Sequence, residues 1–257
     1  MLAAASLHLS TAFSKGEAPL APDIERLYDA GQYRQAAEAL RAALEQNPQN
    51  TSLDYWLGRS FFEIRDFSKA ISSFERAVKI VPSSSEYHDW LGRACGRKAE
   101  ENIHSNMPDA LPFARRARHE FELAVKLDAT NIKAQRDLIA FIANAPGSLG
   151  GGEEHALQQI RALSVVDATE GTLALADLYA EQKKFNQADA EYQKVLESGV
   201  GRIDIYFQVA DYCRDRSDAE RMERAVEAVA KIASSNRRLS YYRGVALVLA
   251  KGDLAVA

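Results

Sequence analysis

The side chains best suited to chemistry are scattered along this chain and form no catalytic pattern. The candidates are His8, His88, His104, His119, His155, Cys95 and Cys213. No histidine lies in an HExxH arrangement, and none is paired with a cysteine at the spacing of metal ligands. The two cysteines lie far apart and are expected in the core. The sequence therefore predicts no metal, no cofactor and no catalytic residue.

A glycine-rich stretch, GSLGGGEEHA from Gly147, precedes a predicted helix and invites comparison with phosphate-binding loops. No Lys-Ser or Lys-Thr pair follows it, and Glu153 and Glu154 already supply negative charge at the start of the helix. We expect a flexible connection between helices. GxSxG and SxxK motifs are also missing from the sequence, so we expect a protein that is not an enzyme.

The densest basic run contains Arg115, Arg116, Arg118 and His119. A run of this kind is compatible with nucleic-acid contact, but no aromatic residues are interleaved with it. The formal net charge of the chain is -4, which gives no general attraction to nucleic acid. We therefore interpret the run as a solvated helix face and predict no nucleic-acid partner.

The composition favours an all-helical, water-soluble fold. Of the 257 residues, 47% are hydrophobic and 26% are charged, while glycine and proline number only 14 and 7. Alanine, leucine, glutamate, arginine and glutamine recur throughout, and these are good helix formers. No uninterrupted apolar run is long enough for a transmembrane helix.

The first residues leave the cellular compartment open. Residues 1–14 form a short apolar stretch that is similar to the end of a secretory signal peptide, although it lacks a basic segment. If it is a remnant of such a signal, the protein is periplasmic or exported. Otherwise residues 1–22 are a disordered leader and the protein is cytoplasmic.

The chain repeats itself at a period of 34 residues, which is a signature of stacked helical repeats. Small, apolar and turn-forming residues recur at this spacing in the first half of the sequence. The pairs are Ala36 and Ala70, Leu40 and Phe74, Ala43 and Ala77, Pro48 and Pro82, Trp56 and Trp90, Leu57 and Leu91, and Gly58 and Gly92. So many coincidences in one register predict a repeat architecture.

These residues resemble the consensus of the tetratricopeptide-repeat (TPR) family, and we expect a member of the bacterial type. The best match runs from Thr51 and has Leu57, Gly58, Phe61, Ala70, Phe74, Ala77 and Pro82 at the family's positions. The resemblance implies an all-α, right-handed α-solenoid of about six helix-turn-helix units plus a C-terminal half repeat. The first helix of each unit is called helix A and the second helix B.

The repeat pattern also predicts how the chain is divided. Six TPR-like repeats are expected over residues 23–236, with insertions near 104–116 and 145–152. Residues 237–257 are expected to form a final helix A and the start of an incomplete repeat. Because this last segment is apolar, we expect self-association through it or a longer native chain.

The predicted groove, lined by helix A, carries the candidate binding residues. Positions that recur in helix A give a basic half, which consists of Arg59, Arg93, Arg97, Lys133 and Arg136, with Tyr55 beside them. The later repeats give an acidic half, which consists of Glu170, Asp177, Asp204 and Asp211. Tyr55 and Asp89 stand where the TPR clamp that binds chaperones has asparagine, so this clamp is not expected.

These features predict a scaffold or adaptor that binds a protein or peptide in the groove. Acidic residues of that partner would suit the basic half of the groove. The alternative for these charges is simple solvation of the helix surface. Two other functions stay open: a regulatory or substrate-recruiting segment of a larger enzyme or complex, and a transport-associated solenoid with a small-ligand pocket. Trp56 and Trp90 are interpreted as packing residues, with an exposed aromatic pair as the alternative.

Overall fold

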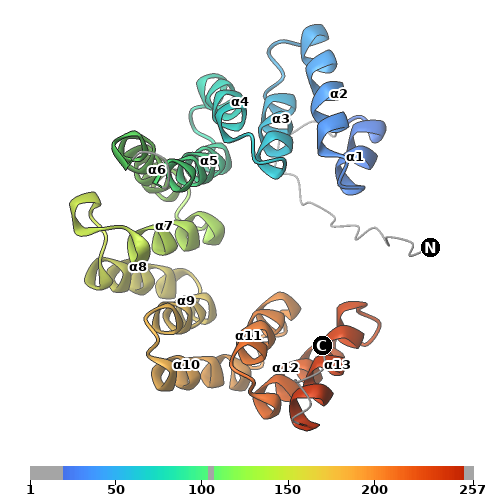
Figure 1. Ribbon diagram of the computed structural model, residues 1–257, viewed down its shortest axis with the longest axis vertical. Helices are drawn as coiled ribbons and strands as arrows, with labels where there is room; N and C mark the ends of the chain where they lie inside the picture. The colour runs from blue at the N-terminus through green and yellow to red at the C-terminus, as the bar shows by residue number, and fades with distance from the viewer. Residues whose placement is uncertain (1–19, 104–106, 252–257) are drawn as a thin grey trace. The chain divides into compact units, whose positions relative to one another are not determined.

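The computed structural model describes residues 20–103 and 107–251, and within these ranges every regular element is helical (Figure 1). The expected leader and the segment beyond residue 251 therefore lie outside the described residues. No described helix is both long and apolar enough to cross a membrane.

The chain divides into two compact units, Met1–Glu153 and Glu154–Ala257. Helices of the first unit are α1 (Pro22–Asp29), α2 (Tyr33–Gln46), α3 (Thr51–Glu63), α4 (Phe67–Ile80), α5 (Ser85–Ile103), α6 (Met107–Leu127) and α7 (Ile132–Asn144), followed by the short 3-10 turn η1 (Gly147–Leu149). At the boundary, α8 (Glu153–Val166) begins, and the second unit continues with α9 (Ala168–Glu181), α10 (Phe185–Glu197), α11 (Ile203–Asp215), α12 (Ala219–Ile232) and α13 (Arg238–Lys251).

Helices that follow one another in sequence pack in pairs through small residues. In the first unit α1 packs on α2, α3 on α4 and α5 on α6, and in the second α9 packs on α10 and α11 on α12. Gly58 of α3 lies against the ring of Phe74 in α4, so closely that an added Cβ would be 2.6 Å from the ring. Gly92 of α5 meets Phe121 of α6 in the same way, at 2.8 Å. The periodic glycines therefore set how closely two helices approach.

The turns that join the two helices of a pair share one backbone feature. A single residue with positive φ ends the first helix in four of the pairs: Gly31, Arg65, Lys183 and Ser217. A polar side chain then caps the second helix in two of these turns, where Asp66 accepts from the Lys69 amide and Asp218 from the Arg221 amide. Only one of the four residues is glycine, so the turn tolerates mild strain at the others.

The inserted residues of the third repeat lengthen both of its helices. α5 has 19 residues and α6 has 21, against 13 and 14 in α3 and α4. Pro112 lies inside α6. The additional turns extend the pair beyond its neighbours, which matters for a pocket described below.

Several packing predictions are confirmed by the burial of the side chains. Cys95 and Cys213 are completely buried. Trp56 and Trp90 are only 5% and 6% exposed, so the alternative of an exposed aromatic pair is wrong. In α13, by contrast, Leu247 is 62% exposed. Self-association through this helix stays a prediction.

Candidate functional site: a cation cluster around Trp90

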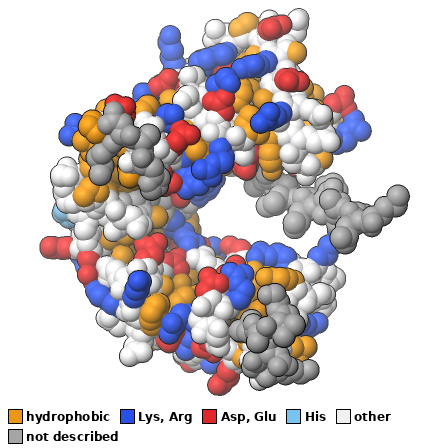
Figure 2. All heavy atoms as spheres, in the orientation of Figure 1, with side chains coloured by type: hydrophobic (Ala, Val, Ile, Leu, Met, Phe, Trp, Pro, Cys, Tyr) orange, Lys and Arg blue, Asp and Glu red, His pale blue; other side chains and the backbone are white. Residues whose placement is uncertain are grey.

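Three basic side chains from three successive A helices converge on the indole of Trp90. The guanidinium carbon of Arg59 lies 4.8 Å from the ring centroid and that of Arg93 lies 5.0 Å from it. The ammonium nitrogen of Lys133 lies 4.4 Å from the same centroid. We call these four residues the Trp90 cluster. Figure 2 shows basic side chains gathered over the region of α5 and α7.

The repeat explains why these side chains meet. Arg59 and Arg93 occupy the same position of α3 and α5, one repeat apart, and Lys133 lies near the start of α7. Packing of α3 on α5 and of α5 on α7 places equivalent faces of the helices side by side. Trp90 lies on the middle helix, so its ring is within reach of both neighbours.

Arg59 is held by aromatic rings. Its guanidinium carbon is 4.4 Å from the centroid of Trp56, 5.1 Å from that of Tyr28 and 5.7 Å from that of Tyr55. Cation-π attraction stabilises the charge there without neutralising it. Within the described ranges Arg59 forms no ion pair, and its Nε is buried without a hydrogen-bond partner. The side chain is therefore a half-buried cation held by aromatic rings, with no described carboxylate within ion-pair distance.

Among the described residues, Arg93 is the member of the cluster that has carboxylate partners. Its Nε donates to Asp137 Oδ2 over 2.5 Å, and it lies 3.3 Å from Asp89 Oδ2. Burial, together with repulsion from Asp137, raises the pKa of Asp89 to about 8 against the opposing effect of Arg93. Asp89 is therefore mostly protonated at neutral pH.

The surroundings of Lys133 act on its charge in opposite directions. Desolvation of its ammonium group against Trp90, followed by repulsion from Arg93, lowers its pKa. The carboxylates of Asp89 and Asp137 act in the opposite direction but do not outweigh these effects. An anion placed beside Lys133 would offset the repulsion from Arg93.

The buried carboxyl of Asp89 predicts how stability varies with pH. Its folded pKa of about 8 is far above the unfolded value of 3.8, so the native state holds the proton more tightly. The stabilisation is complete below pH 4 and is lost as the pH rises through 8. Asp54, whose pKa is raised to about 6 by burial, adds to the decline at lower pH.

We expect Asp89→Asn to remove most of the decline between pH 6 and pH 8, because asparagine stays neutral at both values. The free energy of unfolding of the wild type should fall by about 2 kcal/mol or more over this interval. Urea denaturation of the wild type and the variant at each pH measures the difference. If the free energy of unfolding changes equally with pH in the two proteins, Asp89 is ionised in the native state over the whole interval.

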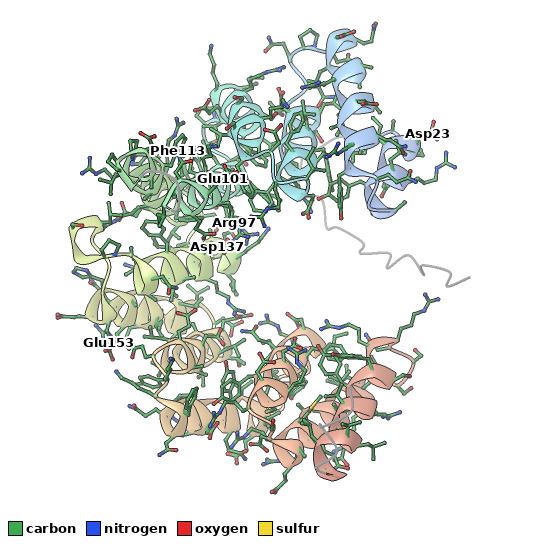
Figure 3. The ribbon with its side chains drawn as sticks, viewed as in Figure 1. Asp23, Arg97, Glu101, Phe113, Asp137 and Glu153 are labelled. Carbon is green, nitrogen blue, oxygen red and sulfur yellow. The ribbon has the colours of Figure 1, made fainter. Side chains whose placement is uncertain are left out.

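The other predicted binding residues are Tyr55, Arg97 and Arg136, which have no cation-π contact with Trp90 in the described part of the chain. Tyr55 is buried, and its hydroxyl donates to Glu86 Oε1 over 2.5 Å, which fixes its ring beside Arg59. Arg97 lies further along α5 and pairs with Glu100 at 2.7 Å. Arg136 is half-buried on α7, in the turn after Lys133. Figure 3 labels Arg97 and Asp137, which lie close together between α5 and α7.

In the second unit, most of the predicted acidic residues are bonded to neighbouring helices. Glu170 is almost fully buried and pairs with Arg202. Asp177 accepts from Tyr192 at 2.6 Å, and Asp211 accepts from Tyr242 at 2.7 Å. Their charge is thus largely used in packing the repeats together. Asp204 is the exposed member of this set.

No histidine, cysteine or acidic cluster in the described part of the chain could hold a metal ion. His88 illustrates this, since its Nδ1 lies 2.6 Å from Glu120 in the core between α5 and α6. Arg116, from the basic run, bridges Glu75 at 2.6 Å and Glu120 at 3.4 Å. Arg118, from the same run, pairs with Glu122 at 2.7 Å. Arg116 and Arg118 of α6 are therefore held in ion pairs, one of them with Glu75 of α4.

Comparison with known proteins agrees with this helical geometry. Models of the tetratricopeptide repeat match residues 24–85 and 173–198. The first match covers α1 to α4 and the second covers α10 and part of α9. The chain contains tetratricopeptide repeats. Among curated protein sequences, none matches this TPR chain.

Solved TPR structures share the fold. A thermophilic TPR protein of Thermus thermophilus is 20% identical with a TM-score of 0.57, over 73% of this chain and 94% of that one. MamA is 18% identical with a TM-score of 0.51, over 70% of this chain and 95% of the other. Human IFIT1, solved as a dimer with PPP-AAAA, is 18% identical with a TM-score of 0.58, over 88% of this chain and 53% of that one. These similarities show that the chain has the fold of an α-solenoid.

Proposed function

We propose that this TPR protein binds an acidic segment of a partner protein at the Trp90 cluster. The observation that supports the proposal is the convergence of Arg59, Arg93 and Lys133 on one indole ring, with Arg59 and Lys133 lacking an ion-pair partner in the described part of the chain. A carboxylate placed between them gains charge-assisted hydrogen bonds and reduces their mutual repulsion. The scaffold role needs no catalytic group.

The surrounding aromatic rings preorganise the Trp90 cluster for binding. Tyr28, Tyr55 and Trp56 hold the Arg59 guanidinium in place before any ligand arrives. A side chain that is already ordered loses little conformational entropy on binding. Low local dielectric next to the rings also strengthens the attraction of a bound carboxylate relative to one in water. A few acidic residues of a partner are therefore sufficient for specific recognition.

The proposal is tested with two fluorescein-labelled probes, a hexapeptide of glutamate and a hexapeptide of glutamine. Anisotropy titration should show saturable binding of the glutamate probe and no saturable binding of the glutamine probe at the same protein concentration. The affinity should fall as the salt concentration rises, because the interaction is between charges. Equal binding of both probes would contradict the proposal.

Competition distinguishes carboxylate from phosphate as the preferred anion. Unlabelled glutamate hexapeptide should displace the labelled probe completely. A single-stranded oligonucleotide with the same number of charges should displace it more weakly, because Trp56 and Trp90 are buried and offer no open face for base stacking. Stronger displacement by the oligonucleotide would assign the cluster to nucleic acid instead.

A further inference from the structure

A pocket of about 490 Å³ lies next to the Trp90 cluster, between α5, α6 and α7. Most of its lining is apolar, and the larger side chains are Phe62, Ile103, Phe121, Phe141, Pro146 and Leu149. We call it the α5–α7 pocket. Its volume is in the range of pockets that bind small molecules or anchor side chains.

The pocket is built by the two segments that depart from the repeat pattern. The additional turns of α5 and α6 contribute Ala99, Ile103 and Ala114, and the small side chains of the two alanines leave the space open. The glycine-rich turn after α7 contributes Pro146 and Leu149. A regular repeat of 34 residues has neither feature, so the pocket belongs to this chain's insertions.

The wall formed by the glycine-rich turn is fixed in place. Arg118 of α6 donates to the carbonyl of Leu149 over 2.7 Å, and the amide of Gly152 donates to the carbonyl of Ile142 over 3.0 Å. Gly151 lies so close to the backbone of Ala145 that an added Cβ would be 1.8 Å from its carbonyl oxygen. The turn therefore acts as a rigid wall, although the sequence suggested a flexible connection.

The entrance combines apolar surface with charge. Ile103 is 47% exposed at the pocket, while Arg93 and Arg97 line it together with their partners Asp137 and Glu100. Figure 3 shows Arg97 and Asp137 close together at this place. Arg93 belongs to both the pocket and the Trp90 cluster, so an occupant of one lies directly beside an occupant of the other.

We infer that the α5–α7 pocket binds a large apolar side chain of the partner peptide, such as phenylalanine or leucine, beside the acidic residue at the Trp90 cluster. This inference rests on the proposed function and deepens it, since it defines the recognised segment as an acidic residue next to an apolar anchor. Aromatic walls from Phe62, Phe121 and Phe141 suit such an anchor. The shared Arg93 requires that the two residues be close in the peptide.

The test compares two labelled glutamate hexapeptides in which the same internal residue is either phenylalanine or alanine. For wild-type protein, the phenylalanine probe should bind about tenfold more tightly, since burying the ring adds a favourable apolar contribution. Ala140→Phe places a ring in the pocket from an exposed position of α7 and should abolish this preference. The alanine probe should bind Ala140→Phe as it binds the wild type.

Ala42→Phe is the matched control, because Ala42 is exposed on α2 and does not line the pocket. It should retain the tenfold preference. Equal affinity of the two probes for wild-type protein would overturn the inference while leaving the proposed function intact. Failure of both probes to bind would overturn both. Displacement of the phenylalanine probe by micromolar octanoate would also overturn the inference about the α5–α7 pocket, because the pocket would then bind free carboxylic acids.

Discussion

Changing both Arg59 and Lys133 to glutamate is expected to abolish saturable binding of the glutamate hexapeptide. The double variant replaces the two cations that have no ion-pair partner in the described part of the chain with two anions beside Trp90. Each charge contact to a ligand contributes on the order of 1.5 to 3 kcal/mol, so the loss of affinity should be at least about 100-fold. Anisotropy titration of the labelled probe measures it.

A matched control separates this local effect from the general charge of the protein. The double variant Arg34→Glu and Arg224→Glu makes the same change in net charge at exposed positions of α2 and α12. It should bind the probe within about threefold of wild type, since distant exposed charges are screened. A similar loss in both variants would contradict a localised site.

Because glutamate at position 59 could disturb packing, a second double variant, Arg59→Leu with Lys133→Leu, serves as a folding control. It should also lose binding while staying helical by circular dichroism.

Gly58→Val is expected to destabilise the pairing of α3 and α4 strongly. An added Cβ would lie 2.6 Å from the ring of Phe74, which is completely buried and has no room to withdraw. Overpacking of this kind costs about 3 kcal/mol, because the α3 and α4 backbones must separate. Urea denaturation followed by circular dichroism measures the change in the free energy of unfolding.

Two further variants test whether the contact with Phe74 is the cause. Gly244→Val, in α13, adds the same side chain where nothing lies within 4 Å of the new Cβ, and it should change stability by less than about 1 kcal/mol. Phe74→Ala should partly relieve Gly58→Val, so the double variant should be more stable than the sum of the single losses predicts. Strict additivity would show that the glycine is required for another reason.

The fold was predictable because each TPR unit repeats the same pattern of small and large residues where its two helices pack. Gly58, Phe74 and Ala77 are sufficient to identify a helix pair, and the structure places these residues in the core of α3 and α4. The insertions were also visible as breaks in the period. What they build was not visible, because a pocket depends on where Ile103 and Leu149 lie in space.

The candidate site was predicted in part. Helical spacing identified Arg59, Arg93 and Lys133, and the structure brings these three together. Their common centre, Trp90, was interpreted only as a packing residue, and it is in fact both buried and in contact with the cations. The sequence shows which face a residue occupies, but not that its ring is shared by two neighbouring helices.

The carboxylates show the limit of reasoning from the sequence most clearly. Asp137 was not among the predicted site residues, although it neutralises Arg93. Protonation of Asp89 follows from its burial and from the distance between α5 and α7, neither of which is contained in the repeat pattern. In the second unit, Asp177 and Asp211 looked like free acidic groups and are bonded across helices. Charge balance at a site requires the packing of the helices to be known.

The most direct test of the Trp90 cluster uses intrinsic fluorescence. The chain has only two tryptophans, Trp56 and Trp90, and both contact Arg59. Titration with unlabelled glutamate hexapeptide, which has no tryptophan, should change the emission saturably. The change should have the affinity measured by anisotropy and persist in Trp56→Phe, where Trp90 alone emits. Unchanged emission from Trp90 while the labelled probe still binds would place the acidic ligand elsewhere and contradict the account.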